Sequence, residues 1–207
     1  MSKSPLYSNE LSLSPHAKSI PYAAEHLAEN SCSTNYGFKN LKIKPSLIET
    51  IPELTDDRSL GTLVQAINKR ETCFFTVGCS SELISSYEGH YREGYLEFAW
   101  NCASCVQDAI NYFALYFHFT KSLLSRGFNQ PVQFKWIIQE ASFSDADIHG
   151  FSCAVHVRTR SRSSPEQANQ AWQLSLRMLD AYLSRVETLQ SKPIYKPLSE
   201  YSNEISS

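Results

Sequence analysis

Arg158, Arg160 and Arg162 alternate along the chain and lead directly into Ser164 and Pro165. Alternate residues of a strand point to the same face. A proline that follows a serine is typical of a helix start, where free backbone N–H groups attract anions. Guanidinium groups in that setting bind phosphate or carboxylate. The pattern therefore predicts an anion site, and the alternative is a strand end whose arginines serve solubility.

The same strand face is expected to carry Lys135, His156 and Tyr95, whose ring is available for stacking on a base. This is the place where we expect a nucleotide, RNA or a phosphate-bearing partner to lie. The predicted ligand-binding set is Tyr95, Lys135, His156, Arg158, Arg160 and Arg162.

Cys102 and Cys105 lie where a strand gives way to a helix, and the helix start favours a thiolate. The local sequence is similar to the redox turn of thioredoxin-like proteins. Those proteins need a further strand, a helix and a cis-proline turn before their last helix, whereas two strands fill residues 127–162 here. We therefore favour two thiols packed at a helix start over a redox pair.

Two metal sites can be drawn from the sequence, and we predict neither. A zinc site could use Cys73, Cys79, Cys102 and Cys105, with His90, but structural zinc sites usually have two closely spaced ligand pairs and only one is present. Buried thiols explain these cysteines more simply.

Asp145, Asp147 and His149 place two carboxylates and an imidazole in a hairpin loop, a donor set that suits a divalent cation. Acidic hairpin tips are mostly solvated turns. We favour the solvated turn.

Hydrophobic periodicity supplies the elements that must position these residues. It predicts helices over residues 57–70, 105–126 and 165–186, and strands over 73–79, 95–100, 132–139 and 151–160. The expected fold class is α+β, a two-layer sandwich in which helices cover one face of an antiparallel four-stranded sheet, in the order α-β-β-α-β-β-α.

The 207 residues suit one domain with polar ends. We expect residues 1–50 to be largely flexible apart from a short helix over 22–28, residues 51–190 to form the domain, and residues 191–207 to be a flexible tail. The helix over 105–126 is apolar around much of its circumference, which indicates a core position and a homodimer contact.

A net charge of -2 gives no overall field that would gather nucleic acid or anionic lipid. No segment reaches the roughly 18 uninterrupted apolar residues of a membrane span. We expect a cytoplasmic protein that does not bind membranes, and six scattered cysteines do not suggest a disulfide framework.

The stretches at residues 63–68 and 74–80 resemble the wybutosine-synthesis methyltransferase family, in which a helix ending in Ile-Asn precedes a strand and a Thr-x-x-Cys-Ser turn. The resemblance implies a tRNA-directed activity that depends on S-adenosylmethionine, and it carries over Cys79 and Ser80. This chain has Ser81 and Glu82 where that family continues with Gly and Arg, so the turn and a basic contact differ.

The leading hypothesis is a binding or interaction domain for an anionic ligand, because no nucleophile, base and orienting group are apparent together. The alternative is an enzyme, either the methyltransferase or a thiol-based redox protein. Its candidate catalytic residues are Cys79, Ser80, Cys102 and Cys105.

Overall fold

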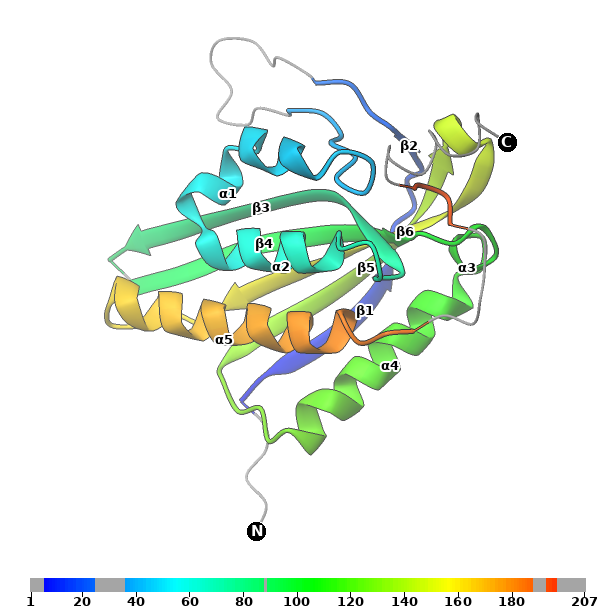
Figure 1. Cartoon of the computed structure of the whole chain (residues 1–207). Helices are drawn as coiled ribbons and strands as arrows, with labels where there is room; N and C mark the ends of the chain where they lie inside the picture. The colour runs from blue at the N-terminus through cyan, green and yellow to red at the C-terminus, as the bar shows by residue number, and fades with distance from the viewer. Residues whose placement is uncertain (1–5, 25–35, 88, 188–192, 197–207) are drawn as a thin grey trace.

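The computed structural model describes residues 6–24, 36–87, 89–187 and 193–196, which form one mixed sheet with helices packed against it (Figure 1). The elements are β1 Ser8–Leu13, β2 Lys18–Ile20, the 3-10 helix η1 Pro45–Thr50, α1 Glu53–Asp56, α2 Arg58–Ile67, β3 Phe74–Ser86, β4 Gly89–Trp100, α3 Ala103–Val106, α4 Ile110–Ser125, β5 Val132–Phe143, the 3-10 helix η2 Ser144–Ala146, β6 Ile148–Thr159 and α5 Pro165–Leu183. The strand order is β1-β5-β6-β4-β3, and β2 pairs with β5 beyond the end of β1.

The α+β class is confirmed, and the four predicted strands are present and pair antiparallel, but the prediction of a four-stranded, wholly antiparallel sheet is wrong. The sheet has six strands, and β1 and β2 run parallel to β5. Together with the short helices η1, α1, α3 and η2, these strands also change the predicted order of elements. Both extra strands come from residues 1–50, where we expected little regular structure. They are too short to show a hydrophobic alternation of their own, and β5 supplies their hydrogen-bonding partners.

Two other expectations fall mostly on parts of the chain that are not described. Of the helix predicted over 22–28, residues 22–24 are described and are not helical, and residues 25–28 lie outside the described residues. The tail over 191–207 is described only at 193–196, where Tyr195 is buried.

The central strands are longer than the sequence suggested. Residues 80–94, which lie between two of the predicted strands, extend these strands into the outer half of the β3–β4 hairpin, from Ser80 opposite Tyr95 to Ser86 opposite Gly89. Most of these side chains are partly exposed, so the segment lacks the alternation of apolar and polar residues that identifies a half-buried strand.

Local capping signals fix where two long helices begin. Asp57 precedes α2, and its Oδ1 accepts hydrogen bonds from the backbone N–H groups of Ser59 and Leu60 at 3.1 and 3.0 Å. Ser164 caps α5 in the same way, with Pro165 at the first helical position. Both helix starts agree with the sequence analysis.

Helices α2, α4 and α5 cover one face of the sheet (Figure 1). The core between them is rich in aromatic residues from both layers, and every one is almost fully buried: Phe74, Phe98, Phe134 and Trp136 from the strands, and Phe119 and Trp172 from the helices. Removal of this apolar surface from water is the main stabilising contribution to the fold.

A second, smaller apolar cluster covers one end of the opposite face. Phe75 lies at its centre, with ring centroids 6.4 Å from Phe38, 5.9 Å from Phe143 and 5.0 Å from Tyr195. The opposite face is therefore closed at this end and mainly polar over the rest of its area. Within the described ranges, no helix combines the length and apolar character needed to cross a membrane.

Candidate functional site

The strand register brings three of the predicted ligand-binding residues into one row across the face that the helices leave open. Tyr95 of β4 is paired with His156 of β6, and His156 is paired with Lys135 of β5. Side chains paired in this way have Cβ atoms roughly 4.5–5.5 Å apart. Ser80 of β3 and Glu10 of β1 extend the row to both edges. We call these five residues the central row.

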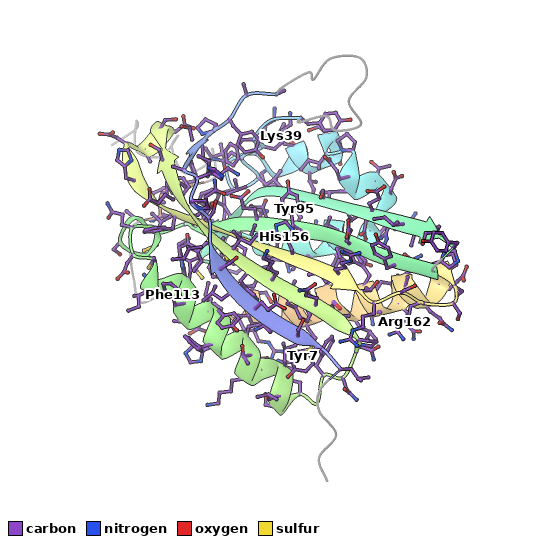
Figure 2. All side chains as sticks on the ribbon, turned by 180° about the vertical axis from the view of Figure 1, so that it is seen from behind. Tyr7, Lys39, Tyr95, Phe113, His156 and Arg162 are labelled. Carbon is purple, nitrogen blue, oxygen red and sulfur yellow. The ribbon has the colours of Figure 1, made fainter. Side chains whose placement is uncertain are left out.

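Tyr95 and His156 form an aromatic pair in the middle of the central row, which we call the platform. Their ring centroids are 5.3 Å apart and the planes are tilted by 31°. Figure 2 shows the two side chains next to each other on the open sheet face. An aromatic pair in this position can support a planar group of a ligand.

Arg158 lies one row further along the sheet, between Glu93 of β4 and Gln133 of β5. Its Nε is 3.4 Å from Glu93 Oε2, and its guanidinium carbon lies 4.5 Å from the ring centroid of Tyr91. Because both charged side chains are largely exposed, this ion pair contributes little to stability.

Arg160 and Arg162 are not brought to this site. Strand β6 ends at Thr159, after which the backbone N–H of Arg160 bonds to Pro131 and the backbone of Arg162 pairs with His90. These partners lie on the two opposite sides of β6, and Figure 2 shows Arg162 at the end of the sheet, away from Tyr95 and His156. Of the three arginines, Arg158 alone lines the cleft described next.

A cleft of about 1350 Å³ lies over the open face, between the sheet and residues 36–56. Its basic lining residues are Lys18, Lys39, Lys135, His156 and Arg158, and its acidic ones are Glu53, Asp56, Glu82, Glu93 and Glu97. The acids Glu53, Asp56 and Glu82 come from α1 and β3, on one side of the cleft. Lys135, His156 and Arg158 come from β5 and β6, on the other side. The side at β5 and β6 is therefore mainly basic and the side at α1 and β3 mainly acidic, the exceptions being Lys39, near α1 in the chain, and Glu93, which is paired with Arg158.

A buried carboxylate separates this cleft from the second apolar cluster. Glu97 is only 6% exposed, and its Oε2 accepts a hydrogen bond from Lys18 Nζ at 2.7 Å. Its Oε1 accepts one from Ser152 Oγ, also at 2.7 Å. Lys18 also lies over the ring of Tyr22, whose hydroxyl donates to the carbonyl of Val77. Lys18 and Tyr22 thus attach the N-terminal segment to the sheet at the closed end of the cleft.

Burial and charge change the acidity of the cleft groups. Burial, with a further contribution from Glu97, raises the pKa of Tyr95 to about 12. The pKa of Tyr22 is raised for the same reasons. Burial, followed by the nearby Lys135 ammonium, lowers the pKa of His156. At neutral pH both hydroxyls are protonated and His156 is mostly neutral, so Lys135 and Arg158 carry the positive charge on the basic side.

Cys79 and Ser80 also line the cleft, beside an irregularity in β3 between Thr76 and Gly78. Burial raises the pKa of Cys79 to about 12, and the carboxylates of Glu53 and Asp57 act in the same direction. The thiol is therefore protonated at neutral pH and is a poor nucleophile.

Cys102 and Cys105 lie outside the cleft, at the start of α3. Their sulfur atoms are 2.8 Å apart, and the backbone N–H of Cys105 donates to Cys102 Sγ at 3.2 Å. Burial raises the pKa of Cys105 to about 11, which is the opposite of the shift expected for an activated thiol.

The described residues contain no group of three or more side chains arranged to hold a metal ion. Asp145, Asp147 and His149 lie at the exposed β5–β6 turn, where Asp147 adopts a left-handed backbone conformation with φ 52°. Turn geometry accounts for Asp147, because Asp is one of the few side chains that tolerate this conformation.

Sequence reasoning missed Lys18 and Lys39, from residues expected to be flexible, and Tyr22, from the short helix predicted over 22–28. β2 has only three residues, which is too short for any periodic signal. Comparisons of the chain with protein-family models, curated proteins and solved structures found no match.

Proposed function

We propose that this chain binds a small anionic ligand that carries a planar ring, of the nucleotide class, in the cleft over the open sheet face. The observation that carries the proposal is the central row, in which the Tyr95–His156 platform lies directly beside Lys135. The ring of the ligand stacks on the platform, and its phosphate lies between Lys135 and Arg158.

Lys135 supports this assignment because its ammonium group is open to a ligand, with Glu10 of β1 as its neighbour in the central row. Within the described part of the chain its ammonium group has no ion-pair partner, and it projects from the sheet as an exposed side chain. A phosphate placed there gains a charge-assisted hydrogen bond without breaking one within the protein.

The distribution of charge favours a small ligand over an extended RNA strand. A nucleic acid that crossed the whole face would pass the carboxylates of Glu53, Asp56 and Glu82 on the β3 side, where its phosphates would be repelled. The closed end, formed by Glu97 and the second apolar cluster, also limits how far a polymer could extend. A mononucleotide fits on the basic side alone.

The test is calorimetric titration of the whole chain with nucleoside mono- and diphosphates, inorganic phosphate and a single-stranded RNA oligomer, at several salt concentrations. We expect nucleotides to bind more tightly than inorganic phosphate, because only nucleotides use the platform. Lys135→Ala should weaken binding roughly tenfold or more, since a hydrogen bond to a charged group contributes about 1.5–3 kcal/mol.

Arg177→Ala is the matched control, because it removes an exposed positive charge from α5, on the opposite side of the sheet. The nucleotide affinity of the Arg177→Ala variant should equal that of the wild type. Equal nucleotide affinity in the wild type and in a Lys135→Ala, His156→Ala double variant would refute the proposal, and so would tighter binding of RNA than of any mononucleotide.

A further inference from the structure

The strongly exposed large apolar side chains of this protein gather along one edge. Seven such side chains occur among the described residues, and five of them lie on β1, just before it, or on α4: Leu6, Leu13, Ile110, Phe117 and Leu124. An exposed apolar region of this kind is typical of an interaction surface. It lies away from the cleft, because β1 is at the edge of the sheet and α4 is on the face that the helices cover (Figure 1).

Three of these residues form a straight line along α4. Ile110, Phe117 and Leu124 are 64%, 65% and 63% exposed, and successive members are seven residues apart. Seven residues make about two helical turns, so all three side chains project in nearly the same direction. Ala114 and Lys121 are also exposed and lie between them on the same side of the helix. We call these five residues the α4 stripe.

The α4 stripe runs beside an open sheet edge. In the described part of the chain β1 pairs with β5 on one side only. Helix α4 is fixed along β1, since the Tyr116 hydroxyl donates to the carbonyl of Asn9 and the Asn9 side chain donates to Thr120. An uncovered strand edge favours association with another chain.

We infer that a second copy of this chain covers the α4 stripe, with the two α4 helices antiparallel and a two-fold axis passing by Phe117. The arrangement of the stripe is the reason for choosing a second copy. Ile110 and Leu124 lie seven residues before and after Phe117, with matching size and exposure, so the three large apolar members of the stripe are arranged alike in both directions, and only Ala114 and Lys121 differ. A two-fold axis needs a surface that is complementary to itself.

In this arrangement Phe117 meets the partner's Phe117, and Ile110 meets the partner's Leu124. Lys121 lies opposite the partner's Ala114, where the lysine stem can cross the small side chain while its ammonium group stays in water. The two β1 edges then lie on the same side of the helix pair, and Leu13 adds to the apolar contact.

The first test is the mass of the full-length protein in solution, measured by light scattering and sedimentation. The wild type should be a dimer, and Phe117→Glu should be a monomer because it places two charges against each other at the axis. Tyr87→Glu is the matched control, since Tyr87 is 97% exposed at the remote β3–β4 turn, and it should remain dimeric. A monomeric wild type, or a dimeric Phe117→Glu variant whose circular dichroism is unchanged, would overturn the inference.

Cysteine cross-linking tests the antiparallel register independently. Ile110→Cys should cross-link under mild oxidation only when mixed with Leu124→Cys, because residue 110 lies roughly 20 Å from its own copy along the antiparallel pair. The wild type controls for the native cysteines. Cross-linking of Ile110→Cys with itself, without cross-linking in the mixture, would show a parallel pair and exclude the proposed axis.

Discussion

Lys18 Nζ lies 2.7 Å from Glu97 Oε2, and this contact joins the edge strand β2 to the central strand β4 across the intervening strands β5 and β6. Ser152 of β6 donates to the other carboxylate oxygen, so three strands meet at one buried acid. This contact ties the N-terminal segment to the open face, and the position of that segment defines the closed end of the cleft. The integrity of the cleft therefore depends on residues that are far apart in the sequence.

Replacement of Lys18 by alanine should lower the free energy of unfolding by about 1–3 kcal/mol. Loss of one member of a buried ion pair costs more than this, but Lys18 is a quarter exposed and water can partly replace it. Urea denaturation measures the change. A Lys18→Ala, Glu97→Gln double variant should lose less stability than the sum of the two single variants, whereas strict additivity would show that the two side chains do not interact.

Asp57→Ala should be more damaging, with a loss of about 3–5 kcal/mol in the free energy of unfolding. Asp57 is 3% exposed, caps α2, and uses Oδ2 to accept hydrogen bonds from Arg92 at 2.7 Å and from Trp172 at 2.6 Å. The alanine variant leaves the guanidinium and the indole N–H buried without a partner. Asp57→Asn keeps one oxygen for the cap and should lose clearly less. A loss below about 1 kcal/mol for the alanine variant would contradict this account.

The pKa of His156 should rise in Lys135→Ala, because Lys135 is the second cause, after burial, of its depression below 6.5. The folded state favours the neutral imidazole, so stability should fall as the pH drops below 6.5 towards the folded-state pKa, with no effect above that interval. In the Lys135→Ala variant, this loss of stability at low pH should be smaller. An NMR titration of the imidazole measures the pKa, with Arg177→Ala as the unshifted control. A lower pKa of His156 in the Lys135→Ala variant than in the wild type would contradict this prediction.

Alkylation of Cys105 should be slow at neutral pH and should accelerate about tenfold per pH unit as the pH rises towards 11. The reason is that burial, and then the hydrogen bond with Cys102, raises the pKa of the Cys105 thiol to about 11. Peptide mapping after timed treatment with iodoacetamide measures the rate, with Cys105→Ser as the control that identifies the signal. A rate that levels off below pH 8 would indicate an activated thiol and would favour redox chemistry.

The sequence alone predicted the elements whose signals are local. The spacing of Leu60, Leu63, Val64 and Ile67 matches the buried side of α2, and the cap at Ser164 matches the start of α5. The alternation around Trp136 and Val155 identified two central strands and the face that their polar residues share. Periodicity and capping depend on neighbours within a few positions, which is why they can be read without a structure.

The tertiary structure decided which of the polar residues meet. Tyr95, His156 and Lys135 share a row because of the registers of β4, β6 and β5, whereas the end of β6 at Thr159 separates Arg160 and Arg162 from them. Sequence alternation gives the face on which a side chain lies but not its partner on the next strand.

The N-terminal strands show the same limit most clearly. β1 and β2 pair with segments of β5 more than 120 residues later, and they carry too few residues to show a pattern of their own. What the sequence determined by itself is the three long helices and the four central strands, together with their apolar and polar faces. What only the tertiary structure decided is the edge of the sheet, the closed end of the cleft and the approach of Lys18 to Glu97, because these depend on contacts between residues far apart in the chain.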